Sequence, residues 1–222
     1  MRLSTALTIG VLIAAICLCA AGQNTPGSTA PTEAKGLPPR AAPSDYQAQA
    51  QAGTVTVAAE FKGHWVPTFE GTLSTQDYVV IETGLFGPPG ARIRLSLDDF
   101  ALRLDGRKTP LPSQRYGLVV GSLKDPEWVP PEEAAASKSK TKIGGGGGQS
   151  EDSGPPAEVK IPIAVQRAMA QRVQRAALLE GDRSLPQAGL IFFQYRGKTE
   201  NLESIELIYA GPDGKATLKL QP

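Results

Sequence analysis

The feature that most constrains this chain is a long alternation of apolar and polar residues at positions 77–108. It divides into three runs, at 78–86, 92–97 and 100–105, and a Gly-Pro-Pro-Gly turn at 87–90 separates the first two. A period of two with one apolar face is typical of antiparallel strands that pack on one side and face water on the other. We therefore expect the fold to be built on a sheet that contains this stretch.

Further strands are predicted on both sides of the stretch. Alternating or densely apolar residues mark the segments 54–62, 116–120, 189–195, 204–210 and 215–220. Strands at this spacing, joined by turns rich in Gly and Pro, are typical of a two-sheet β-sandwich. We predict a mainly β fold, an immunoglobulin-like antiparallel β-sandwich with one α-helix and two disordered segments.

The one predicted helix covers residues 161–180. Its apolar residues recur at spacings of three and four, at Val165, Met169, Val173 and Ala176. Pro162 suits its first turn and Gly181 suits its C-terminal cap. We expect this helix to pack across one end of the sandwich. The alternative is a basic amphipathic helix that lies on an anionic membrane.

Residues 1–22 have the pattern of a secretory signal peptide. Arg2 precedes an uncharged apolar run at 6–21, and small residues lead up to a predicted cleavage after Gly22. The apolar run is shorter than the ~20 residues that a membrane anchor needs, so an uncleaved anchor is the second choice. We expect the protein to be exported to the periplasm, the envelope or the exterior, and to touch the membrane only through this signal.

The two cysteines, Cys17 and Cys19, both lie inside this signal. A bacterial lipidation site needs a small residue before the cysteine, and Ile16 and Leu18 are large, so a lipoprotein is the third choice. Cleavage after Gly22 leaves a mature chain without a disulfide, a thiol nucleophile or a cysteine-bound metal.

Two segments have compositions that predict disorder. Residues 23–52 are rich in Pro, Ala, Gln, Ser and Thr, and we interpret them as a tether. Residues 130–158 contain five consecutive glycines and lack the Gly-Lys-Ser/Thr ending of a phosphate-binding loop. We therefore predict one domain at 53–222, interrupted by a disordered insertion at 130–158.

The charge balance argues against a nucleic-acid partner. The chain has 23 Lys and Arg and 22 Asp and Glu, and loss of Arg2 with the signal would leave equal numbers of each. Nucleic-acid binding requires a clustered basic surface, which a neutral chain of this kind does not predict.

The sequence contains no clear catalytic, metal or cofactor motif. His64 is the only histidine, and we expect a surface or strand-edge role for it. Asp98 and Asp99 are adjacent, so in a strand they would point to opposite faces and could not face one cleft as a glycosidase pair. The sequence also lacks a Gly-x-Ser-x-Gly element. We predict no catalytic residues, no metal and no cofactor.

The segments YVVIE at 78–82 and DDFALRLDG at 98–106 resemble those of secreted telokin-like, immunoglobulin-type accessory domains. The late GLIFF strand at 189–193 and the closing hairpin at 203–220 are similar to the end of those domains. The helix and the long insertion depart from their pattern. The resemblance implies a non-enzymatic, exported binding or accessory module, and it carries no catalytic residues to transfer.

These observations predict a non-enzymatic module that contacts an envelope or extracellular protein through a sheet face or a sheet edge. Arg92, Arg94 and Arg103 are the candidate partner-binding residues, because they would form a basic stripe if they shared one face. One alternative is a structural component of the envelope that assembles through the helix or a sheet edge. A hydrolase that uses carboxylates such as Glu82 and Asp99 is the less favoured alternative.

Overall fold

Two long antiparallel strands, β5 (Tyr78–Phe86) and β11 (Gln187–Gln194), form the centre of the fold. The computed structural model describes residues 36–129 and 161–222, which belong to one compact unit. The predicted signal peptide, the first part of the predicted tether and the predicted insertion at 130–158 lie outside the described residues.

The remaining strands are shorter than β5 and β11. The other strands are β1 (Ala48–Ala52), β2 (Val55–Phe61), β3 (Trp65–Thr68), β4 (Gly71–Thr75), β6 (Arg92–Leu95), β7 (Phe100–Leu104), β8 (Leu111–Gln114), β9 (Leu123–Lys124), β10 (Gly181–Ser184), β12 (Ile205–Gly211) and β13 (Gly214–Leu220). Among the described residues, the α-helices are α1 (Tyr116–Val119), a single turn, and α3 (Ile163–Ala176).

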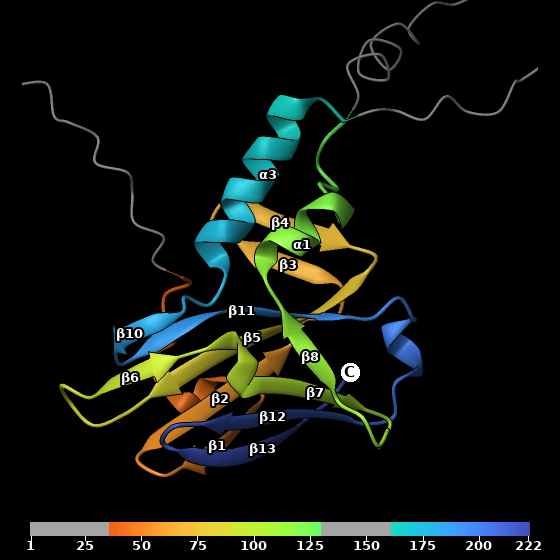
Figure 1. Cartoon of the computed structure of the whole chain (residues 1–222). Coiled ribbons are helices and arrows are strands. Elements are labelled where there is room, and N and C mark those ends of the chain that lie inside the picture. Colours follow the sequence, from red (N-terminus) through yellow and green to blue (C-terminus); the bar gives the residue numbers. More distant parts are fainter. Residues whose placement is uncertain (1–35, 130–160) are drawn as a thin grey trace, which may run out of the picture. The chain divides into compact units, whose positions relative to one another are not determined.

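Eight strands form one curled sheet in the order β1-β2-β5-β11-β8-β7-β12-β13 (Figure 1). Every pairing in it is antiparallel, which confirms the prediction of a mainly β, antiparallel fold. The short strand β8 pairs with both β11 and β7, so the two halves of the sheet are continuous. The terminal strands β1 and β13 approach each other without sharing a ladder, and the sheet is therefore close to a barrel.

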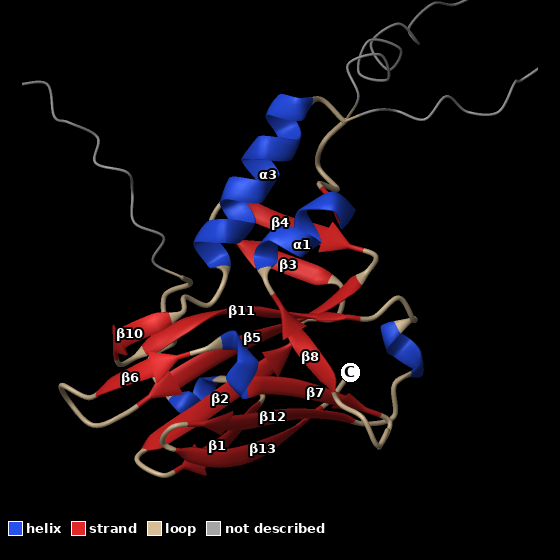
Figure 2. Cartoon of the chain, in the orientation of Figure 1, coloured by secondary structure: helices blue, strands red, loops and turns tan. Residues whose placement is uncertain are grey.

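The concave side of the sheet encloses the main hydrophobic core. Alternate residues of its strands point inward, among them Val79, Ile81, Ile191, Phe193 and Leu207, all completely buried. A second core lies on the other side of β5 and β11, where α3, α1 and the small sheet β3-β4-β9 cover these strands (Figure 2). It includes Val80 and Phe192 from the central strands and Met169 and Val173 from α3.

The central strand β5 is buried on both faces, so the predicted water-facing side is wrong for this strand. All residues from 79 to 85 are buried, including Glu82 and Thr83. The outward face was expected to be in water because it carries the charged residue Glu82. The second core covers Val80, and two cations neutralise Glu82, which explains the difference.

The predicted strand at 116–120 is also wrong, because these residues form α1 and enter a short 3-10 turn. Their burial does not alternate: Gly117 and Leu118 are both exposed, whereas the next residue, Val119, is fully buried. A single buried side chain between exposed or half-buried neighbours fits one helical turn and does not fit a strand in a sheet.

The tether predicted at 23–52 is too long at its C-terminal end. Residues 48–52 form β1, whose alternating Ala and Gln residues pair with β2. Ala52 is buried, and Ala48 and Ala50 pack against the main core. Small apolar residues alternating with glutamine have the composition of a linker, which hid this strand in the sequence.

The predicted helix is confirmed as α3, but it ends earlier than predicted. Ala177 leaves the helix in an extended conformation and forms a parallel bridge with Leu190 on β11. The amide of Leu178 then donates to the carbonyl of Leu190 at 3.0 Å. Gly181 has a φ of 101° and opens β10 instead of capping α3. Among the described residues, no helix combines the length and the apolarity needed to cross a membrane.

Gly189 permits this close approach of residues 177–178 to β11. A Cβ atom on Gly189 would lie 2.4 Å from the Cα of Leu178 and 2.5 Å from its backbone nitrogen. These are backbone atoms, so a side-chain rotation cannot relieve the clash.

We expect Gly189→Ala to lower the free energy of unfolding by about 1–3 kcal/mol through overpacking. Urea denaturation followed by circular dichroism measures the effect. Gly121→Ala is the control, because its Cβ would meet no atom within 4 Å, and we expect a change within about 0.5 kcal/mol. Equal effects of the two substitutions would contradict the close approach.

Tyr209 on β12 is completely buried in the main core, and its hydroxyl has no hydrogen-bond partner among the described residues. Burial, together with the charges of Asp99 and Asp213, raises the pKa of Tyr209 to about 12. The fold therefore favours the neutral phenol. The contribution of the neutral Tyr209 phenol to the stability of the fold is complete below the ordinary tyrosine pKa of 10.0. This contribution is lost as the pH rises from there toward 12.

Tyr209→Phe should raise the free energy of unfolding by about 1 kcal/mol at neutral pH, because it removes a buried hydroxyl without a partner. The gain should grow above pH 10, where the wild-type phenol ionises on unfolding. The matched control is Tyr78→Phe, which removes the hydrogen bond from the Tyr78 hydroxyl to the carbonyl of Leu118 and should be mildly destabilising. A loss of stability in Tyr209→Phe would show that its hydroxyl is satisfied.

Candidate binding cleft

A cleft of about 370 Å³ lies on the outer side of β11. We call it the apolar cleft. It lies between α1, the end of α3 and β8. Its lining comprises Leu97, Gln114, Arg115, Tyr116, Gly117, Gln174, Ala177, Leu178, Leu179, Glu180, Leu190 and Phe192.

Separate segments build the walls of the apolar cleft. Leu190 and Phe192 are alternate residues of β11 and share its outer face, which forms the floor. The segment after α3 forms a second wall, because the bridge between Ala177 and Leu190 holds it against the strand. Tyr116 on α1 closes the opposite side.

Polar groups lie at the edge of the apolar cleft. A carboxylate oxygen of Glu180 accepts a hydrogen bond from the amide of Leu97 at 3.2 Å. The guanidinium of Arg115 lies 3.9 Å from the other carboxylate oxygen, and its side chain is 78% exposed. These are the two charged side chains of the lining, and they face each other. An apolar floor with a polar edge is the usual composition of a recognition site.

The predicted basic stripe of Arg92, Arg94 and Arg103 does not form. Arg92 and Arg94 lie on β6, which pairs only with β10, whereas Arg103 lies on β7 in the large sheet. Arg92 contacts both carboxylate oxygens of Asp182, and Arg103 contacts Glu206 at 3.0 Å. The acidic residues that neutralise Arg92 and Arg103 are more than 80 positions away in the sequence. The local sequence pattern around the arginines therefore does not reveal these ion pairs.

Asp98 and Asp99 lie in a 3-10 turn that precedes β7. The Ser96 hydroxyl accepts a hydrogen bond from the amide of Asp98 at 3.2 Å. Burial raises the pKa of Asp99, and the neighbouring charge of Asp98 adds to the rise. Neither carboxylate lines the apolar cleft.

Glu82 belongs to a cluster of four charges on the outer side of β2 and β5, which we call the Arg40 network. Arg40 donates to both carboxylate oxygens of Glu82, at 3.1 and 2.9 Å, and also contacts Glu60. Lys62 contacts Glu60 at 2.7 Å and Glu82 at 3.1 Å. The Arg40 guanidinium lies over the ring of Tyr46 at 4.4 Å. Both cations are therefore engaged, and the Glu82 carboxylate has a structural role.

Glu60 shows the electrostatic effect of this network. Burial alone would raise the pKa of Glu60, but hydrogen bonds from Lys62 and Arg40 and their charges outweigh it, and the pKa is lowered. The network therefore stabilises the fold above the ordinary glutamate pKa of 4.5, and this contribution is lost as the pH falls through the lower folded-state pKa.

His64 is half-buried between two carbonyl groups and lies at the start of β3. Its Nδ1 lies 2.7 Å from the carbonyl oxygen of Tyr78, and its Nε2 lies 2.9 Å from that of Gly197. The ring also stacks on Tyr195. This location agrees with the predicted strand-edge role, and the ring joins the loop after β11 to β5. Among the described residues, no group of three His, Cys, Asp or Glu side chains is placed to hold a metal ion.

The chain was compared with protein-family models, with curated proteins and with solved structures, and none of them matched. We therefore infer the function from the site itself. Sequence reasoning missed the apolar cleft because its lining comes from segments at 97, 114–117, 174–180 and 190–192. The one sequence feature that points toward the cleft is the densely apolar strand at 189–195, because residues from other elements must pack against its outer face.

We expect Arg40→Ala to lower the free energy of unfolding at pH 7 by about 1–3 kcal/mol, because it leaves the buried Glu82 carboxylate short of a partner. Arg92→Ala is the control: the Arg92–Asp182 pair is exposed, at 58% and 67%, and its loss should cost at most about 0.5 kcal/mol. The difference between Arg40→Ala and wild type should shrink below pH 4.5, because the Glu60 carboxylate becomes protonated first in the unfolded chain and then, at lower pH, in the folded chain. Urea denaturation at pH 7 and pH 3.5 measures both effects, and a difference independent of pH would contradict the ionic explanation.

Proposed function

We propose that this protein is an exported, non-enzymatic binding module that docks an apolar segment of an envelope or extracellular protein in the apolar cleft. The observation that carries the proposal is the cleft itself: an apolar floor on β11 with its two charged residues at the edge. Its volume of about 370 Å³ is at the lower end of the ~300–1,000 Å³ range of binding pockets.

The chemistry of the lining favours binding over catalysis. Its one carboxylate, on Glu180, faces Arg115 and also accepts a backbone hydrogen bond. Its one hydroxyl belongs to Tyr116, and neither a serine nor a histidine lines the cleft. A nucleophile with an adjacent base, the arrangement that covalent catalysis needs, is absent from this lining.

A protein partner is favoured because an apolar side chain is exposed beside the cleft. Leu118 on α1 is 61% exposed and follows the lining residues Tyr116 and Gly117. A docked segment would cover Leu118 as it filled the cleft. An apolar centre with a polar rim is the usual anatomy of a protein interface.

The signal-like residues 1–22 support export, and the resemblance to telokin-like, immunoglobulin-type secreted accessory domains supports an accessory role. The immunoglobulin-like description is part of the proposal. It has support from the antiparallel pairing and from the two halves of the sheet that face each other across the main core.

We expect Gln174→Trp to block the apolar cleft, because Gln174 is exposed on α3 and its side chain lines the opening. Binding of anilinonaphthalene sulfonate, a dye that fluoresces in apolar sites, should weaken at least about tenfold, or ~1.4 kcal/mol. Gln166→Trp is the matched control: this residue is also exposed on α3 and lies ~12 Å nearer its start, at 1.5 Å per residue. A pull-down from envelope extract with both variants should lose a stoichiometric partner only for Gln174→Trp, and retention of that partner would refute the proposed site.

A structural component of the envelope remains the alternative. Size-exclusion chromatography of the chain from Gln23 separates the two functions. A monomer that captures one partner supports the binding module, and a large homo-oligomer supports assembly.

A further inference from the structure

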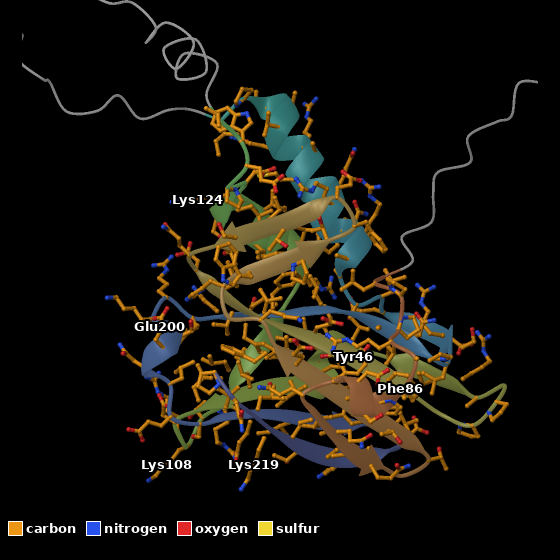
Figure 3. All side chains as sticks on the ribbon, turned by 180° about the vertical axis from the view of Figure 1, so that it is seen from behind. Tyr46, Phe86, Lys108, Lys124, Glu200 and Lys219 are labelled. Carbon is orange, nitrogen blue, oxygen red and sulfur yellow. The ribbon has the colours of Figure 1, made fainter. Side chains whose placement is uncertain are left out.

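A second hollow, of about 550 Å³, lies where the small sheet β3-β4-β9 meets the loop after β11. We call it the polar groove. Its lining comprises His64, Ser74, Thr75, Gln76, Asp77, Lys124, Arg196, Gly197, Lys198, Thr199 and Glu200. It shares no residue with the apolar cleft. Lys124 and Glu200 appear on the same side of the molecule in Figure 3.

The charges of the polar groove leave two lysines available for a ligand. Arg196 pairs with Asp77 at 2.9 Å, so this cation is already engaged. Lys124 and Lys198 are exposed and form no ion pair with any of the described residues. Glu200, the remaining carboxylate, is also exposed. Two ammonium groups against one free carboxylate favour a ligand that carries negative charge.

An exposed tryptophan borders the polar groove. Trp65 on β3 is opposite Ser74 on β4, and Ser74 is in turn opposite Lys124 on β9. Paired residues of neighbouring strands place their side chains on the same face, ~4.5–5.5 Å apart between Cβ atoms. The row Trp65, Ser74 and Lys124 therefore crosses the outer face of the small sheet. Trp65 is 56% exposed and belongs to neither the main core nor the second core, so core packing does not explain why an indole is present at this position.

The walls of the polar groove are fixed before any ligand arrives. The ring of His64 contacts the carbonyl oxygens of Tyr78 and Gly197, and it stacks on Tyr195. The loop that carries Arg196 and Lys198 is thereby held against the start of β5. The hydroxyls of Thr75 and Ser122 are 2.6 Å apart at the other wall. A preformed site loses less conformational entropy on binding.

We propose that the polar groove binds an acidic saccharide chain. The apolar C–H face of a pyranose ring would stack on Trp65, and its carboxylates would pair with Lys124 and Lys198. Sugar hydroxyls would donate to Glu200 and to the side-chain oxygens of Ser74 and Gln76. An acidic peptide is less suited to this lining, because it brings few donors to Glu200 and no pyranose face to Trp65.

Isothermal titration calorimetry with hexagalacturonate, a carboxylated saccharide, tests the proposal, and uncharged maltohexaose is the comparison ligand. The wild-type chain should bind hexagalacturonate at least about tenfold more tightly than maltohexaose, a difference of ~1.4 kcal/mol. The double variant Lys124→Ala/Lys198→Ala should weaken binding at least about tenfold, and Trp65→Ala should do the same. Added salt should weaken binding as well, since exposed charges are screened.

The matched control is Lys108→Ala/Lys219→Ala, which removes the same charge at the end of the molecule away from Lys124 (Figure 3). It should leave affinity within about twofold. The variant Gln174→Trp should also bind hexagalacturonate normally. Failure of the saccharide proposal can therefore be distinguished from failure of the function proposed for the apolar cleft. The proposal is overturned if the wild type binds maltohexaose equally well, fails to bind hexagalacturonate at millimolar concentration, or binds hexaglutamate as tightly without needing Trp65.

Discussion

The pairing of β5 with β11 is the constraint on which the rest of the structure depends. Eight residue pairs join these two strands, and both strands are buried on both faces. A sheet strand with two buried faces needs an apolar cover on each side. The curled sheet supplies one cover through its own concave face, and α3 with the small sheet supplies the other. The long apolar strand at 187–194 thus explains why a helix is present at all.

Burial of the second face of β5 has an electrostatic consequence. Glu82 lies on that face, and a buried carboxylate must be paired. Lys62 on the adjacent segment supplies one cation, and Arg40 supplies the other from the residues before β1. Arg40 also lies over Tyr46, so the same contacts hold residues 36–46 against the sheet. A segment with the composition of a linker becomes part of the fold because one carboxylate needs a partner.

Local patterns predicted the elements whose burial has a simple period, and they failed where long-range contacts decided the outcome. The strands at 92–97, 100–105, 204–210 and 215–220 show a period of two in sequence and in structure. Residues 48–52 were missed because their pattern consists only of Ala and Gln, and their strand depends on pairing with β2. The arginine stripe does not form because Arg92 and Arg94 lie on β6, which pairs with β10, whereas Arg103 lies on β7 in the large sheet. The apolar cleft was hidden because no single segment contains it.

The apolar cleft and the polar groove both lie along the course of β11 and the loop that follows it. Their different chemistry has one cause. Within β11, the outer face between α3 and α1 presents Leu190 and Phe192, so that hollow is apolar. After Gln194, the chain leaves the sheet and passes beyond the elements that cover β11, which are α3, α1 and the small sheet. Solvent-facing residues such as Arg196 and Lys198 follow. His64 stabilises this exit by joining Gly197 to the start of β5. The central pair of strands therefore provides a rigid support for both hollows, and the cover that buries its outer face determines where the apolar lining ends and the charged lining begins.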